Sequence, residues 1–123
     1  MNVVDSSGWL EFFSDGINAD YFKEPLDDLE NLLVPSITIY EVFKVILRER
    51  NENTALQGVA LMMQGHVIDL SAEIATTAAV ISLQNKVPMA DSIIWATAVK
   101  FEATLWTQDE DFVNMPKVRY FKK

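Results

Sequence analysis

The sequence predicts an α/β fold, a three-layer α/β/α sandwich built around a five-stranded parallel sheet. Short apolar runs alternate with amphipathic stretches along most of the chain, and 50% of its 123 residues are hydrophobic. Buried strands separated by helices are typical of a parallel sheet that is covered on both faces. The chain contains no internal repeat, linker or low-complexity segment, so we expect a single domain over residues 1–123.

The five candidate strands are short apolar runs. They lie at residues 2–4, 32–35, 67–70, 103–107 and 118–121. Runs of this length suit strands and are too short for ordinary helices. Several are bounded by Asp, Gly or Pro, which are residue types that end regular structure.

Helical spacing of apolar residues fills the segments between these runs. We expect helices at residues 7–13, 38–50, 53–63, 71–85 and 90–101, one or two short surface helices within 18–30, and a turn of helix at 109–113. Ser71 is the expected N-cap of one helix, and Asn53 or Thr54 that of another. Near the helix ends, Met63 is expected in the core and Phe101 on an inward face.

The formal net charge of −8 argues against a protein that coats nucleic acid, because phosphate contacts need Lys and Arg. It is compatible with an enzyme that meets a polyanion through bound divalent cations, two of which would offset about four negative charges. An acidic surface also suits a basic protein partner. The absence of cysteine excludes disulfides and thiolate metal sites.

The first residues lack the basic region of a signal peptide. No apolar run approaches the roughly 20 residues that a membrane-spanning helix needs. We therefore expect a soluble cytoplasmic protein that does not contact a membrane.

Acidic residues follow two of the predicted strands. Asp5 ends the first apolar run, and Asp109 lies just past the fourth. Ligands of open parallel sheets bind outside the carboxyl ends of the strands, so both side chains are expected at one edge. Glu41 lies early in the helix after the second strand, which begins near the same edge. Asp91 lies in the helix that leads into the fourth strand, and the pattern alone does not place it.

Each of these acids also has an ordinary structural explanation. Asp5 can form an Asx turn or cap the first helix, and Asp91 and Asp109 can cap the helices in which they lie. Glu41 can pair with a basic residue one turn away on its own helix. Taken singly, these explanations are favoured, so the argument for a site depends on the combination of all four.

Four local motifs occur around the acids, at residues 4–7 (Val-Asp-Ser-Ser), 35–41 (Pro-Ser-Ile-Thr-Ile-Tyr-Glu), 88–98 (Pro-Met-Ala-Asp-Ser-Ile-Ile-Trp-Ala-Thr-Ala) and 107–112 (Thr-Gln-Asp-Glu-Asp-Phe). In this order they resemble the four motifs of the PIN-domain nucleases, and they span nearly the whole chain. One such motif alone is weak, whereas the ordered set is specific. The short length further resembles the VapC-like branch, the ribonuclease toxins of bacterial type II toxin–antitoxin pairs.

The resemblance implies a five-stranded parallel sheet between helices and a metal-dependent endoribonuclease. The matching catalytic and metal-site acids are Asp5, Glu41, Asp91 and Asp109, which would hold Mg²⁺ or Mn²⁺. The family thus supplies the position of Asp91 that the pattern leaves open. It also implies a cognate antitoxin protein and a homodimer.

Further residues of the motifs are candidates for a supporting role. Thr107 matches the hydroxyl residue of the fourth motif and Ser7 the hydroxyl near the first. Asp109 and Asp111 both fall in the fourth motif. Asp109 is nearer the strand end and is the expected ligand, whereas Asp111 either orders the short helix or acts as an outer-shell acid.

The proposed chemistry explains why carboxylates are needed. Hydrolysis of a phosphodiester requires a nucleophilic water, in-line geometry and stabilised charge on the phosphoryl oxygens, all of which carboxylate-bound divalent cations provide. Without metal, clustered carboxylates repel, so we expect a raised pKa for at least one of them. Lys44 and Arg48 share a helix face with Glu41 and either contact RNA phosphates or are ordinary solvated charges. The basic residues of 117–123 are interpreted as a solubilising tail.

Two other functions are less well supported. A phosphatase that uses a strand-end aspartate as nucleophile would normally carry a second acid two residues on, where Ser7 stands. An RNA- or protein-binding module with a PIN fold but no catalysis would not need the intact acidic set. The lone His66 is interpreted as structural or solvated. The aromatic-rich segment 9–21 is either core or a surface for a second copy or an antitoxin helix.

Overall fold

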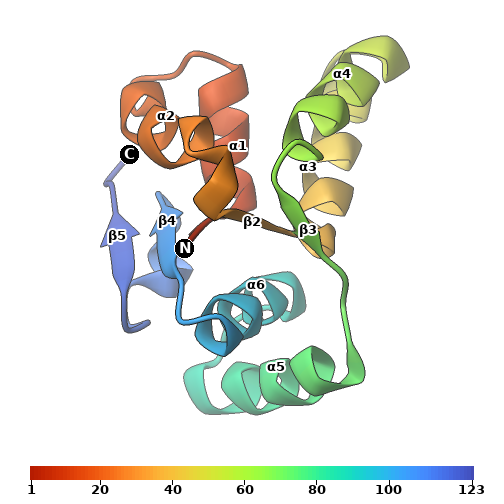
Figure 1. Cartoon of the computed structure of the whole chain (residues 1–123). Coiled ribbons are helices and arrows are strands. Elements are labelled where there is room, and N and C mark those ends of the chain that lie inside the picture. The colour runs from red at the N-terminus through yellow and green to blue at the C-terminus, as the bar shows by residue number, and fades with distance from the viewer.

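The strands form one fully parallel five-stranded sheet in the order β3-β2-β1-β4-β5 (Figure 1). The computed structural model describes all residues 1–123. The strands are β1 (Asn2–Val4), β2 (Leu32–Pro35), β3 (His66–Ile68), β4 (Thr104–Thr107) and β5 (Val118–Tyr120). All five strands were predicted, with ends that differ by at most about two residues. The first strand of the chain lies at the centre of the sheet, between β2 and β4.

The connections between strands are mostly helical, as the spacing predicts. The helices are α1 (Ser6–Phe13), α2 (Ala19–Asp27), α3 (Ser36–Glu49), α4 (Glu52–Met62), α5 (Ala72–Asn85) and α6 (Met89–Lys100), with short 3-10 turns η1 (Leu29–Asn31) and η2 (Glu110–Phe112). Ser71 caps α5 as expected, with its Oγ accepting a hydrogen bond from the backbone N–H of Ile74. The N-cap of α4 is Asn51 instead of Asn53 or Thr54. None of the helices combines the length and the apolar character needed to cross a lipid bilayer.

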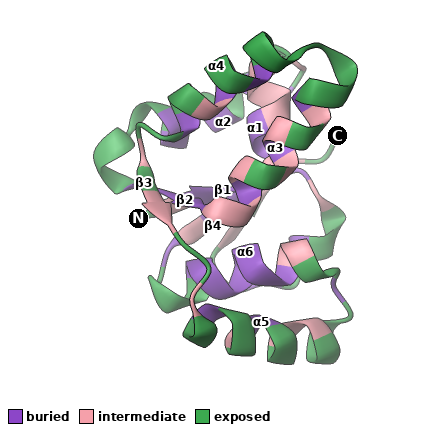
Figure 2. Ribbon diagram, turned by 90° about the vertical axis from the view of Figure 1, so that its right-hand side faces the viewer, coloured by how far each residue is buried: buried purple, intermediate pink, exposed green.

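Side-chain alternation along the strands divides the core between the two faces of the sheet. Val4 and Trp106 pack into the cluster beneath α1, α2, α3 and α4. Val3, Leu33 and Leu105 point the opposite way, into the cluster beneath α6. Figure 1 shows these helices on opposite sides of the sheet, and Figure 2 shows buried residues on the strands and on the helix faces turned toward them. The predicted α/β/α sandwich is confirmed.

Helix α5 forms an outer layer on α6 and does not contact the sheet broadly. Ile74 and Ala78 of α5 pack against Ile93 and Ala96 of α6. The far side of α5 faces solvent, as the exposed residues of this helix in Figure 2 show.

Two residues expected in the core are exposed. Met63 is 60% exposed, although its neighbour Met62 is fully buried, and Phe101 is 37% exposed. Both stand at the C-caps of their helices, α4 and α6. Helical spacing predicts which side chains face the core only within the helix, and it no longer applies at the C-cap. The predictions for Met63 and Phe101 are therefore wrong.

The aromatic-rich segment belongs mainly to the core. Trp9 is buried, and Phe12 and Phe13 are partly buried against the same cluster. Tyr21 is 54% exposed and stacks on Phe121, with ring centroids 4.5 Å apart. Only the rim of this segment is therefore open to a partner.

Candidate active site

Asp5 lies at the carboxyl end of β1 and is held from three directions. Its carboxylate accepts hydrogen bonds from the backbone N–H of Gly8 (3.0 Å), from Ser7 Oγ (2.8 Å) and from Thr107 Oγ1 (2.8 Å). The bond from Gly8 makes Asp5 the N-cap of α1, so its ordinary structural explanation holds as well. Asp5 is only 2% exposed, so this carboxylate is fixed in place.

The environment of Asp5 opposes its charge. Burial raises the pKa of Asp5 to about 6, although the hydrogen bonds from Ser7, Thr107 and Gly8 lower it. The nearby negative charge of Asp109 is a smaller contribution to the same increase. A cation close to Asp5 would therefore favour its ionised form.

Thr107 links Asp5 to the loop that follows β4. Its Oγ1 donates to Asp5 and accepts a hydrogen bond from the backbone N–H of Asp109 (2.8 Å). Ser7 Oγ similarly accepts from the backbone N–H of Gln108 (3.4 Å). The two hydroxyl residues of the supporting set thus lie between Asp5 and residues 108–109.

Asp91, Asp109 and Asp111 form an acidic cluster in which each offers a carboxylate oxygen within 4.8 Å of the others. Asp109 caps η2, with its Oδ1 accepting from the backbone N–H of Asp111 (2.9 Å). Asp91 does not cap its helix, because Pro88 occupies the N-cap of α6 and Asp91 lies in the first turn. Packing of α6 against η2 brings the three carboxylates together.

Burial raises the pKa of Asp91 to about 8. A hydrogen bond with the Asp111 side chain and the negative charges of Asp109, Asp111 and Glu41 are the smaller contributions to this increase. This is the raised carboxyl pKa expected of clustered acids without a cation.

Glu41 approaches the acidic cluster from α3. Its carboxylate accepts a hydrogen bond from Ser6 Oγ, and its charge contributes to the raised pKa of Asp91. The charge of Asp109 acts on both Asp5 and Asp91, so Asp109 lies near each of them. The structure therefore brings the four predicted acids to one edge of the sheet and groups Asp111 with Asp91 and Asp109.

The basic residues predicted to contact RNA lie on the exposed side of α3. Lys44 Nζ is 5.6 Å from the ring centroid of Tyr40. Arg48 contacts Glu49 at 3.6 Å. Neither forms an ion pair with Glu41. Both side chains are exposed, so a substrate can reach them.

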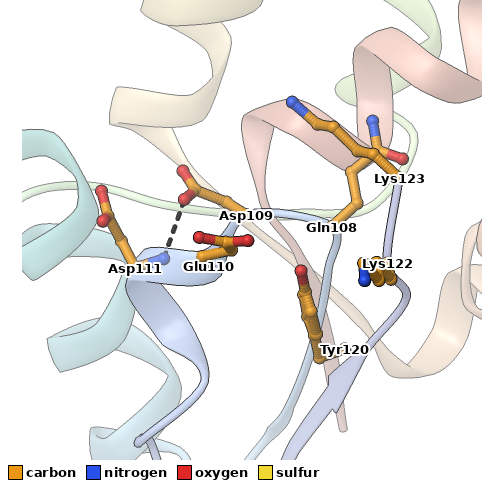
Figure 3. Close-up of a pocket in the computed structure, with 7 residues that line it drawn as sticks. All are labelled: Gln108, Asp109, Glu110, Asp111, Tyr120, Lys122 and Lys123. Atoms are coloured by element: carbon orange, nitrogen blue, oxygen red, sulfur yellow. Dashed lines mark hydrogen bonds between the residues drawn. The ribbon is translucent and has the colours of Figure 1, made fainter.

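A pocket of about 320 Å³ adjoins the acidic cluster (Figure 3). Asp109, Glu110 and Asp111 line one side of it, and Tyr120, Lys122 and Lys123 line the other. The pocket thus joins the cluster to the end of β5 and the two residues beyond Phe121.

The donor set of the acidic cluster fits a hard divalent cation. All three side chains offer carboxylate oxygens, the ligands that Mg²⁺ and Mn²⁺ prefer, and none offers nitrogen or sulfur. The like charges that raise the pKa of Asp91 would be relieved by a bound cation. Asp91, Asp109 and Asp111 are the residues with the geometry to hold one.

Sequence reasoning missed polar residues that support this region. Ser6 bonds to Glu41, and its only signal was its place beside Ser7 in the first motif. Asn18 is buried, and its side-chain amide donates to Gln108 Oε1 (3.0 Å) and to the backbone carbonyl of Lys122 (3.2 Å). No local pattern connects residue 18 with residues 108 and 122, so packing alone reveals this contact.

Comparisons with known proteins agree with this architecture. The family model of the PIN domain matches residues 3–118, a range that contains all four motifs. Among curated protein sequences there is no match. The chain is similar to a solved toxin–antitoxin complex from Klebsiella pneumoniae, with 22% identity, a TM-score of 0.80 and coverage of 100% of both chains.

Two further solved structures share the fold. One is VapC20 from Mycobacterium tuberculosis, described as a sarcin–ricin loop cleaving toxin, with 16% identity, a TM-score of 0.79 and coverage of 97% of this chain and 99% of that one. The other is DNA-bound VapBC from Salmonella typhimurium, with 15% identity, a TM-score of 0.74 and coverage of 98% and 96%. At these identities the likeness establishes the fold.

Proposed function

This chain belongs to the PIN-domain family, and from that premise we propose that it is a metal-dependent endoribonuclease, the toxin of a toxin–antitoxin pair. The observation that carries the proposal is the acidic cluster, in which Asp91, Asp109 and Asp111 place carboxylate oxygens within 4.8 Å of one another. The cluster lies beyond the carboxyl ends of β1 and β4, where open parallel sheets bind their ligands. The proposed reaction is hydrolysis of RNA phosphodiester bonds.

The proposed site consists of the acidic cluster together with Asp5 and Glu41. A bound Mg²⁺ or Mn²⁺ would supply charge stabilisation on the phosphoryl oxygens and a nucleophilic water at neutral pH. Asp5, held by Ser7, Gly8 and Thr107, provides a fixed negative charge at the buried end of the site. This fixed position limits the reorganisation needed when substrate binds.

Lys44 and Arg48 are proposed to bind RNA phosphates on the α3 side of the site. Both side chains are exposed and share the helix that carries Glu41. Phosphate contacts by such residues position the substrate without reading its sequence. Lys44 and Arg48 would therefore not determine which RNA is cleaved or at which sequence.

The proposal is tested by RNA cleavage in the presence of Mg²⁺ or Mn²⁺. We expect cleavage that stops on addition of EDTA and that is abolished in Asp91→Asn and in Asp5→Asn. Asp20→Asn, which removes the same charge from the exposed first turn of α2, is the matched control and should cleave normally. Cleavage by Asp91→Asn at the parent rate would contradict the proposed role of this carboxylate.

The alternative is a PIN-fold module that binds RNA or protein without catalysis. Titration calorimetry with Mg²⁺ and Mn²⁺ separates the two functions. The nuclease requires metal binding that weakens in Asp91→Asn, whereas parent protein that binds neither ion would favour the module.

An antitoxin protein and a second copy of the chain are the proposed partners, with the cytoplasm as the proposed location. A net charge of −8 suits a basic antitoxin segment. An apolar pocket of about 240 Å³ lined by Trp9, Phe12, Leu26 and Leu61 offers a place for its apolar side chains. Co-expression with the product of the neighbouring reading frame should give a stable complex in which RNA cleavage is inhibited.

A further inference from the structure

Two lysines lie beside the acidic cluster with no protein partner for their side chains. Lys122 and Lys123 line the 320 Å³ pocket together with Asp109 and Asp111. Neither lysine takes part in an ion pair or a cation–π contact. Two positive side chains next to a negative cluster, but unpaired, are available to a ligand that carries negative charge.

Most other basic side chains are already engaged with a carboxylate, a carbonyl or an aromatic ring. These are Lys23, Lys44, Arg48, Lys100, Lys117 and Arg119. None of them lines the pocket beside the acidic cluster. Lys122 and Lys123 are therefore the cations of this chain that a phosphate at the pocket would meet.

The backbone that carries these lysines is anchored. Phe121 donates its backbone N–H to the carbonyl of Thr107 (2.9 Å), and its ring packs on Trp106. The buried Asn18 donates to the carbonyl of Lys122 (3.2 Å). A segment fixed by these contacts differs from the solubilising tail that the sequence suggested, and it holds Lys122 at the pocket.

Tyr120 supplies an aromatic ring to the same pocket. It is half-buried and packs on no other aromatic ring, in contrast to its neighbour Phe121. Figure 3 shows the Tyr120 side chain between Glu110 and Lys122. An aromatic ring that lines a pocket beside basic side chains is an arrangement that binds single-stranded nucleic acid, because an unstacked base can lie on the ring.

We propose that this pocket is a subsite for one nucleotide of single-stranded RNA next to the cleavage site, with its phosphate on Lys122 and Lys123 and its base on Tyr120. The inference rests on the proposed ribonuclease function. The volume is at the lower end of the roughly 300–1,000 Å³ of pockets that hold small ligands. Glu110 lies across the tyrosine from Lys122 and repels a phosphate, which places the phosphate on the lysine side.

The test measures RNA binding separately from cleavage. Fluorescence anisotropy reports the affinity for a labelled single-stranded RNA, with Ca²⁺ in place of Mg²⁺ and the intactness of the RNA checked on a denaturing gel. For the double variant Lys122→Gln/Lys123→Gln we expect weaker binding and a flatter dependence of log affinity on log salt. The slope should change by about 0.7 for each phosphate that the variant no longer binds, or about 1.4 for two.

A control of equal charge separates local phosphate binding from general electrostatics. Lys23→Gln/Lys86→Gln removes the same two charges from exposed positions outside the pocket and should leave the salt slope unchanged. An equal loss of affinity and slope in this control would overturn the subsite.

Tyr120 is tested by a pair of variants that differ in the ring. Tyr120→Ala should weaken binding by about 5-fold to 160-fold, which is the effect of removing one base–aromatic stack. Tyr120→Phe retains the ring and should bind as the parent does. The two variants should bind a blunt RNA duplex with the same affinity, because its bases are already stacked. If Tyr120→Ala loses as much affinity for the duplex as for single-stranded RNA, the proposed stacking interaction is overturned.

The outcomes distinguish this inference from the proposed function. If the lysine variant and the tyrosine variant both bind RNA with unchanged affinity and cleave it normally, the subsite is refuted and the proposed nuclease function stands. If these residues bind RNA but the parent protein does not cleave it with Mg²⁺ or Mn²⁺, the RNA-binding pocket is supported and the proposed nuclease function is refuted.

Discussion

Asp5 and Asp109 each serve two purposes. Asp5 caps α1 and Asp109 caps η2, while the charge of Asp109 also raises the pKa of both Asp5 and Asp91. A cap fixes the side chain in one direction, and a fixed carboxylate is what a metal site requires. The structural explanation of these residues is thus compatible with their proposed role, since the cap orients a carboxylate that we propose binds metal.

Thr107→Val tests this arrangement, because valine keeps the shape and removes the hydroxyl. Asp5 is then without one of its donors, and the backbone N–H of Asp109 is without its acceptor. We expect the free energy of unfolding at pH 7 to fall by about 2 kcal/mol and the pKa of Asp5 to rise further. Urea denaturation measures the first effect. Thr107→Ser keeps the hydroxyl and should recover most of the stability, and equal stability of Thr107→Val and the parent would contradict the role of this hydroxyl.

The pH dependence of stability is a second prediction at this scale. In the metal-free protein, the raised pKa values of Asp5 (about 6) and Asp91 (about 8) mean that the folded state binds more protons than the unfolded chain above about pH 4. Stability therefore decreases as pH rises from about 4 to about 8, because the unfolded chain ionises first. Thermal denaturation in EDTA should show Tm falling over this range, with Mn²⁺ restoring it at pH 8. Asp91→Asn should flatten the upper part of the curve; a Tm that rises with pH in EDTA would be the contrary result.

At the scale of elements, close packing of α1 on the sheet brings Asp5 to the site. Gly8 lies in the first turn of α1, where an added Cβ would stand 2.6 Å from Val4 Cγ1 and 2.8 Å from the ring of Phe22. Both neighbours are fully buried, so neither can move away cheaply. Only glycine lets the helix approach β1 this closely.

Gly8→Ala should therefore destabilise the protein, although alanine favours a helix. Overpacking costs about 1 to 3 kcal/mol and exceeds the roughly 1 kcal/mol gained in helix propensity. Gly58 in α4 is the matched control, because its Cβ would meet the flexible end of Ile46 at 3.2 Å. Chemical denaturation should show a loss for Gly8→Ala, and no loss or a gain of up to about 1 kcal/mol for Gly58→Ala. Equal effects of the two substitutions would refute the packing argument.

The elements themselves were largely predictable, and their relative placement was less so. Apolar runs located the strands, because a strand buried on both faces leaves a contiguous signal. Met63 and Phe101 were misplaced because periodicity fails at helix ends. The strand-end rule placed Asp5 and Asp109, whereas the position of Asp91 depends on how α6 packs on η2, which only the family motifs indicated. The hydrogen bonds of Asn18 join segments about 100 residues apart and carried no sequence signal.

At the scale of the whole molecule, the groove between α5 and the start of α6 is an apolar surface without a cover. A shallow apolar pocket of about 870 Å³ lies over α5 and the start of α6, with Leu83 83% exposed and Met89 72% exposed. Exposed apolar patches of this kind mark interaction surfaces, and a two-fold axis would place the same patch of a second copy against it.

Leu83→Glu should therefore shift the protein toward the monomer. The charge would be buried without a partner in a dimer formed through α5. Thr76→Glu adds the same charge to an exposed position of α5 outside the pocket and should leave the assembly unchanged. Sedimentation velocity measures both. A parent protein that is monomeric at high concentration would contradict the expected homodimer.

The central position of β1 has a consequence for how the protein is made. The strand at residues 2–4 precedes its second neighbour in the sheet, β4, which ends at residue 107. During translation one edge of β1 therefore lacks its neighbour until β4 has been made, and Asp109 and Asp111 follow β4 in the sequence. The complete set of proposed site acids therefore cannot assemble on the ribosome before the chain has been synthesised through residue 111.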